Sequence, residues 1–87
     1  MISPGDVVCS IAGRDKGCFF IVMALTENCA VICDGKKRKT EKPKIKKVKH
    51  LKSGYGFSEK IAEKLSNGEF VTNAELRREI KTLCVAL

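Results

Sequence analysis

Short apolar runs predict β-strands through the first third of the chain. In residues 7–11 apolar side chains recur with the two-residue period of an extended strand. Residues 19–25 are apolar throughout, which is typical of a strand buried on both faces, and residues 29–33 form a third run. Glycine, asparagine and aspartate in the intervening segments are turn formers. We therefore expect three consecutive strands in an antiparallel meander.

The last third of the chain changes to the spacing of amphipathic helices. Ser58 is a typical N-cap for a helix over residues 59–66. A second helix is expected after Thr72, which fits a capping box with Glu75. Because short helices are unstable alone in water, we expect their apolar side chains to pack on the strands or on each other. These side chains are Ile61 and Leu65 in the first helix, and Leu76, Ile80, Leu83 and Leu87 in the second.

A basic segment, residues 36–52, lies between the predicted strands and helices. Pro43 argues against a helix through its middle. The segment after it has apolar residues at helical spacing, but its alternate residues would also share a strand face. We interpret Ile45–Leu51 as a fourth strand. Its lysines would point both ways, so the strand is expected to lie at an edge of the sheet or to project from it. Lys44 would share one face with Lys46, and Lys47 the other with Lys49.

The charge is concentrated in this segment. The chain has a net charge of +7, whereas residues 36–52 alone hold ten cations against one acid, a net charge of +9. Because so many cations repel each other, the segment favours a polyanionic partner. Nucleic acid fits best; an acidic protein, a membrane surface and solubility alone are the alternatives. Without a ligand we expect residues 36–44 to be mobile.

Composition argues against several other classes. The longest apolar run, residues 19–25, is far shorter than the ~20 residues of a membrane span. No signal-peptide pattern is visible, so we expect a cytoplasmic protein. The five cysteines are an odd number, which together with the missing signal peptide indicates a reduced compartment rather than a disulfide scaffold. They lack a Cys-x-x-Cys pair, so we expect no metal site. No phosphate loop or catalytic signature is visible, and we expect no enzymatic activity, cofactor or small-molecule substrate.

Three motifs occur in order in the first half of the chain. They are GDVV at residues 5–8, AGRDKG at residues 12–17, and an apolar strand that ends in Val22. Together they resemble a KOW domain, which implies a small SH3-like β-barrel that binds RNA. The longer run resembles the fourteen-e family of large-subunit ribosomal proteins, through Asp34-Gly35, the basic cluster and His50-Leu51. The tail is similar to the short helical tail of small bacterial KOW proteins.

We therefore expect a mainly β protein. Residues 1–52 would form an SH3-like (KOW) β-barrel with a basic loop, and residues 53–87 a two-helix C-terminal extension packed on the barrel. The expected function is non-catalytic RNA binding, with ribosomal RNA as the RNA and ribosomal proteins as further partners. We expect a monomer in the cytoplasm, associated with ribosomes. The alternative is a protein-interaction module of the transcription or translation machinery.

The candidate phosphate-binding residues lie on the turn of residues 13–17 and along the basic segment. Glycines at both ends of this turn let its backbone approach a phosphate closely. Lysine-rich, arginine-poor charge suits contact with the backbone of folded RNA better than base reading. The candidates are Arg14, Lys16, Lys36, Lys37, Arg38, Lys39, Lys42, Lys44, Lys46, Lys47 and Lys49.

Aromatic side chains for stacking on bases are scarce. The chain has four Phe, one Tyr and no Trp. We expect Phe19 or Phe20 in the core, and Tyr55 as a cover of the barrel rather than a platform for a base. This scarcity argues against a protein that stacks successive bases of a single strand.

Overall fold

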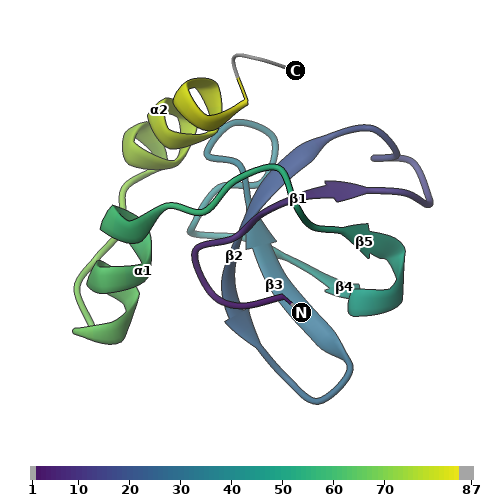
Figure 1. Ribbon diagram of the computed structural model, residues 1–87, viewed down its shortest axis with the longest axis horizontal. Helices are drawn as coiled ribbons and strands as arrows, with labels where there is room; N and C mark the ends of the chain where they lie inside the picture. Colours follow the sequence, from purple (N-terminus) through teal and green to yellow (C-terminus); the bar gives the residue numbers. More distant parts are fainter. Residues whose placement is uncertain (1, 85–87) are drawn as a thin grey trace.

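The computed structural model describes residues 2–84, which form one antiparallel sheet and two α-helices. Figure 1 shows the helices together at one side of the sheet, on the left of the view. The protein is mainly β with a helical C-terminal part, as the sequence predicts. The elements are β1 (Val7–Ser10), β2 (Phe19–Leu25), β3 (Cys29–Cys33), β4 (Lys44–Lys47), a 3-10 helix (Val48–His50), β5 (Leu51–Lys52), α1 (Glu59–Ser66) and α2 (Asn73–Leu83).

The strands follow the order β4-β3-β2-β1-β5, so β4 and β5 are the edges of the sheet. β1, β2 and β3 pair as consecutive antiparallel neighbours, which confirms the predicted meander. Only the three residues of the 3-10 helix separate the two edge strands. Because the four residue steps from Lys47 to Leu51 span about 14 Å at most, the sheet is curled until its edges approach each other. Within residues 2–84 β4 and β5 do not pair, so the curled sheet is not closed.

The predicted strand over Ile45–Leu51 is wrong in its second half. Lys44–Lys47 form β4, but Val48–His50 turn as a 3-10 helix and Leu51–Lys52 form a separate strand. β4 pairs with β3, whereas β5 pairs with β1 at the opposite edge. A single straight strand could not make both sets of hydrogen bonds, which is why the chain bends between them. The expected edge position of β4 is confirmed.

Both faces of the sheet carry a buried apolar cluster. In β2, Ile21 lies on one face and Phe20 and Val22 on the other, and all three are buried. The two-sided burial predicted for residues 19–25 is confirmed at residues 20–22 and is wrong at the end of the strand, where Ala24 and Leu25 are exposed. The expectation that Phe19 or Phe20 is in the core is confirmed by Phe20. The helix-side cluster is Val7, Ile21, Cys33, Ile61, Val71 and Leu76, and the sheet-side cluster is Val8, Phe20, Val22, Ala30, Ile32 and Leu51.

The two helices cover the helix-side cluster. α1 begins at Ser58, whose hydroxyl accepts a hydrogen bond from the backbone of Ile61, and α2 begins at Thr72 with its capping box complete. Both predicted helix starts are confirmed. Ile61 and Leu76 are fully buried against the sheet, so the apolar stripes of the helices are used inside the molecule. Leu87, which the sequence adds to the stripe of α2, lies outside the described residues.

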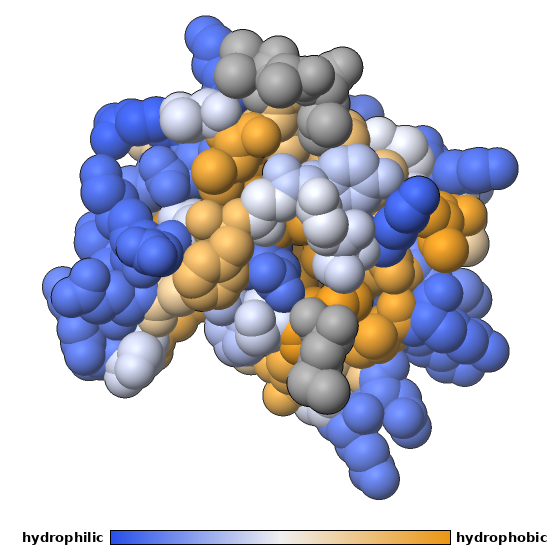
Figure 2. Space-filling model, in the orientation of Figure 1, coloured by the Kyte–Doolittle hydropathy of each residue, from blue (hydrophilic) through white to orange (hydrophobic). Residues whose placement is uncertain are grey.

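Polar contacts join the helices to each other. Lys64 of α1 forms an ion pair with Glu75 of α2, and the hydroxyl of Ser58 donates to Glu79 at 2.6 Å. The hydrogen bond from Lys64 and one from the backbone of Thr72 lower the pKa of Glu75 to about 2. Figure 2 shows hydrophilic side chains over the outside of the helices and hydrophobic ones in the middle of the view, toward the sheet. The helices therefore form one layer whose apolar face packs on the sheet.

Candidate nucleic-acid interface

Asp15 holds the turn of residues 13–17 in place. Its Oδ1 accepts hydrogen bonds from the ammonium of Lys46 at 2.6 Å and from the hydroxyl of Ser10 at 2.8 Å. Its Oδ2 is buried and lies 3.4 Å from the ammonium of Lys44. The acid of the turn is thus bound to β4, and the turn residues on either side of it, Arg14 and Lys16, are exposed.

These contacts set the charge of Asp15. Burial by itself would raise the pKa of this carboxyl group. The hydrogen bonds from Lys46 and Ser10 and the positive charges of Lys46 and Lys44 outweigh burial, and they lower the pKa to about 2. Asp15 is therefore ionised at neutral pH, and it neutralises part of the charge of β4.

Lys46 differs from the other candidate residues because it is buried. Its side chain is 9% exposed, and its ammonium donates to Asp15 and to the carbonyl of Ala12 at 2.7 Å. With Lys44 it reaches toward the same carboxylate, so the predicted shared face of these two lysines is confirmed. The ammonium of Lys46 is used inside the protein, and we leave it out of the phosphate-binding surface.

The basic loop, residues 34–43, is held by its own acid and by α2. The carboxylate of Asp34 accepts the backbone N–H groups of Lys36 at 2.9 Å and Arg38 at 2.8 Å. The backbone of Thr40 donates to the side chain of Asn73 at 2.8 Å, at the start of α2. The guanidinium of Arg77 also donates to the carbonyl of Gly35. Hydrogen bonds therefore hold the backbone of the loop in place, and its lysine side chains are exposed to solvent.

A groove separates this loop from the turn of residues 13–17. It is a cavity of about 380 Å³, and Cys18 and Phe20 form its apolar part. Four cations from three separate segments surround it, and Asp15 contributes an acid to its wall. We call these four residues the groove cations. They are Arg14 from the turn, Lys37 and Arg38 from the loop, and Lys44 from β4.

A second cavity, of about 400 Å³, adjoins the groove because Cys18 and Lys37 line both. It lies between the basic loop and α2, and Lys36 is the other loop cation on its wall. Arg77 and Lys81 of α2 also line it. Arg77 and Lys81 were not predicted as site residues, because the tail is neutral overall. Their four-residue spacing on the polar side of a predicted helix was the available signal.

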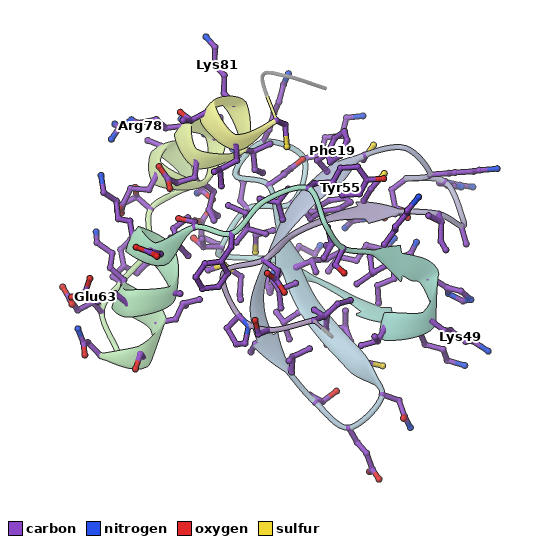
Figure 3. All side chains as sticks on the ribbon, in the orientation of Figure 1. Phe19, Lys49, Tyr55, Glu63, Arg78 and Lys81 are labelled. Atoms are coloured by element: carbon purple, nitrogen blue, oxygen red, sulfur yellow. The ribbon has the colours of Figure 1, made fainter. Side chains whose placement is uncertain are left out.

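The remaining candidates lie elsewhere on the surface. Lys47 and Lys49 line a different cavity, with Glu27 and Asn28 of the β2–β3 turn. Figure 3 shows Lys49 at the lower right of the view, far from Lys81 and Arg78 of α2 at the top. Exposed lysines that line neither the groove nor the cavity beside it complete the set. They are Lys16, Lys39 and Lys42.

The ring of Tyr55 covers Phe19. The two ring centroids are 5.0 Å apart and the planes cross at 79°, which is the favoured edge-to-face geometry of an aromatic pair. Both side chains pack against the helix-side cluster and are partly buried. The predicted covering role of Tyr55 is confirmed, and Figure 3 shows the pair close together beside the sheet.

Over residues 2–84, no three His, Cys, Asp or Glu side chains lie together as metal ligands would. Cys33 is buried, and burial, together with the negative charges of Asp34 and Glu41, raises the pKa of its thiol to about 11. The helices in this part of the chain are too short and too polar to cross a membrane.

The sequence was also compared with known proteins. No family model matches it, and no curated protein matches it. The resemblance to KOW domains therefore rests on the motifs quoted above, and the site rests on its geometry.

Proposed function

We propose that this protein binds the phosphate backbone of folded RNA through the groove cations, without catalysing a reaction. The observation that carries the proposal is the convergence of Arg14, Lys37, Arg38 and Lys44 around one groove. These residues come from three segments of the chain. Their mutual repulsion destabilises the free groove, and an anion bound between them offsets it. Arginine can hold a phosphate with two hydrogen bonds, and lysine adds a flexible point charge.

The fold supports RNA as the anion. The strand order β4-β3-β2-β1-β5 and an apolar cluster whose buried members all lie on strands fit an SH3-like barrel of the KOW type. The AGRDKG motif forms the turn that carries Arg14 into the groove. The proposal therefore includes ribosomal RNA as the ligand and a monomer associated with ribosomes in the cytoplasm, where ribosomal proteins are its neighbours.

The test is the salt dependence of binding to structured fragments of ribosomal RNA. The double variant Lys37→Ala/Arg38→Ala removes two groove cations. Its matched control, Lys47→Ala/Lys49→Ala, removes the same charge from the end of β4 and the 3-10 helix, where both lysines line a different cavity. Each phosphate contact that is lost should reduce the slope of log affinity against log salt by roughly 0.7 to 0.9. We expect a reduction of roughly 1.5 in the groove variant and a much smaller one in the control.

Two results would contradict the proposal. Equal effects of the two double variants would mean that the RNA senses only net charge. Weak binding with no salt dependence would remove RNA as the ligand. It would favour a protein partner instead, for which the 72% exposed Phe70 between the helices is the first residue to change.

A further inference from the structure

The cavity between the basic loop and α2 combines an apolar floor with a cationic rim. Phe19 of β2 and Ile80 of α2 form the floor, and both are partly buried members of the helix-side packing. The rim carries four cations. They are Lys36 and Lys37 from the loop, and Arg77 and Lys81 from α2.

Contacts within the protein support the walls of this cavity. Tyr55 packs its ring against Phe19 with the centroids 5.0 Å apart, which supports the floor on that side. The hydrogen bond from Arg77 to Gly35 keeps the loop at a set distance from α2. A pocket that is already formed costs less ordering when a ligand enters it.

The electrostatic balance of the rim is positive. Asp34 also lines the cavity, but its Oδ1 accepts the backbone N–H groups of Lys36 and Arg38. Four cations therefore face one acid that is already hydrogen-bonded. An apolar floor with a cationic rim complements a ligand that has a flat apolar face and a negative group beside it.

We propose that this cavity holds one unpaired nucleotide of the RNA that lies in the adjoining groove. The base would rest on Phe19 and Ile80, and the phosphates beside it would contact Lys81 and Arg77. Cys18 and Lys37 line both hollows, so an RNA backbone can pass from one to the other without leaving the protein. The cavity of about 400 Å³ lies in the range of small-ligand pockets, ~300–1,000 Å³.

This inference rests on the proposed function and adds to it. The groove cations explain affinity for any folded RNA, whereas this cavity selects an RNA with a nucleotide that is free to leave its stack. It also fits the scarcity of aromatic residues, because one platform suffices for one base. A stacked base contributes roughly a fivefold to hundredfold gain in affinity, so the selection is measurable.

The experiment compares three RNA hairpins of the same stem. One has a single bulged uridine, one has an abasic residue at the bulge, and one has no bulge. The uridine and abasic hairpins carry the same backbone charge, so their difference measures the base alone. We expect the full chain to bind the uridine hairpin about tenfold more tightly than the abasic one. The δ1 methyl resonance of Ile80 should shift with the uridine hairpin only, because the ring current of a base placed over this methyl group changes its chemical shift.

Two variants with matched controls localise the effect. Phe19→Leu keeps an apolar side chain but removes the ring, and it should reduce the preference for uridine over the abasic residue to about twofold. Phe57→Leu, at an aromatic residue that does not line this cavity, should keep the preference. Lys81→Glu should reduce the salt slope by about one. Arg78→Glu, which makes the same charge change on the outside of α2 (Figure 3), should reduce it less.

The outcomes separate the two proposals. Equal binding of the three hairpins with a steep salt dependence would overturn the nucleotide cavity and leave the groove intact. A preference for uridine that survives Phe19→Leu, with no shift of the Ile80 methyl group, would place the base elsewhere and also overturn the cavity. Absence of salt-dependent binding to any hairpin would overturn the proposed function itself.

Discussion

The carboxylate of Asp15 joins the turn between β1 and β2 to the lysines of β4. Asp15 is 14% exposed at its side chain, and it faces the ammonium groups of Lys46 and Lys44. Removing one partner of a buried ion pair is costly because the other charge is left without compensation. This is also where sequence reasoning fails for Lys46. The spacing along β4 shows which way the side chain of Lys46 points. It does not show that the carboxylate of Asp15, from another segment, lies on that side.

Asp15 makes the stability of the protein depend on pH at the acid end. Its pKa is about 2 in the folded protein, below the ordinary value of 3.8. A lowered folded pKa stabilises the native state above the unfolded pKa, and this stabilisation is lost as pH falls through the folded pKa. We expect Asp15→Asn to unfold more easily than the parent chain at pH 7, by about 2 kcal/mol. The difference should largely disappear as the pH falls from about 4 to about 2.

Urea denaturation of both proteins across this pH range measures the effect. Glu75 also has a lowered pKa and contributes to the parent curve, so the informative quantity is the difference between parent and variant. Glu27→Gln, in the exposed β2–β3 turn, should show no such difference. A gap between the parent and Asp15→Asn that stays constant with pH would exclude an ionic role for Asp15.

The joint between the basic loop and α2 is the element on which the site depends. Gly35 is buried there with a φ of +76°, and a Cβ on it would overlap the carbonyl oxygen of Asn73 and approach Leu76. Only glycine permits both this backbone conformation and this closeness. The contacts from Asn73 and Arg77 favour an ordered loop, whereas the sequence predicts a mobile one. Amide relaxation over residues 36–44 will decide between these expectations.

Two glycine substitutions separate backbone strain from the loop contact. Gly68 has a φ of +71°, but a Cβ there would meet no atom within 4 Å. We expect Gly68→Ala to lower the free energy of unfolding by about 1 kcal/mol, the cost of the left-handed conformation. Gly35→Ala should cost about 2 kcal/mol more, because the loop must move off α2.

Thermal unfolding of the two variants beside the parent gives the comparison. Losses of the same size would show that the loop is not pressed on α2, and the cavity between them would lose its support. The Gly35→Ala variant should also bind RNA more weakly at a temperature where it is fully folded, because Lys36 and Lys37 shift with the loop.

The helices and the strands differ in how well their sequence predicts them. Ser58 and Thr72 lie next to the groups they cap, so the starts of both helices are local information and were predicted correctly. The bend at Val48–His50 depends on the partners of β4 and β5, which are β3 and β1 on either side of β2 in a curled sheet. No local pattern contains this arrangement. The meander was predictable because its strands are neighbours in sequence.

At the scale of the whole molecule, one sheet serves two cores. The helix-side cluster needs Ile61 and Leu76, whereas the sheet-side cluster is covered by the curl of the sheet. β2 contributes to both clusters with alternate residues. Loss of either cluster therefore removes the packing from one face of β2, a strand that the other cluster also needs. We expect the helices and the sheet to unfold together.

Ile61→Ala tests this cooperativity. Ile61 is fully buried in α1, and its truncation should lower the free energy of unfolding by about 3 kcal/mol. The variant should still unfold in one transition, with the same midpoint by far-UV circular dichroism and by the fluorescence of Tyr55. Leu25→Ala, at the 39% exposed end of β2, should lower the free energy of unfolding by about 1 kcal/mol at most. Separate midpoints for the two signals would show that the helices detach on their own.

The candidate site was predictable in composition but not in shape. A run of cations identifies Lys37, Arg38 and Lys44 without any structure. Their approach to Arg14 is set by the pairing of β4 with β3 and by the curl of the sheet. The part played by Arg77 and Lys81 depends on where α2 docks, which follows from burial of its opposite stripe. Sequence thus predicted the charge, and tertiary packing sorted it into a groove, a second cavity and a buried ion pair.

The two-sided sheet has a consequence for how the chain is made. Translation delivers β1, β2 and β3 first, and with them Val7, Ile21 and Cys33, which belong to the helix-side cluster. The helices that cover these residues are synthesised after them. A nascent chain that has completed the meander therefore presents a bare apolar surface, the kind that chaperones recognise. Slow translation through residues 34–58 would prolong that exposure, so synonymous changes in this stretch should alter the soluble yield without altering the finished protein.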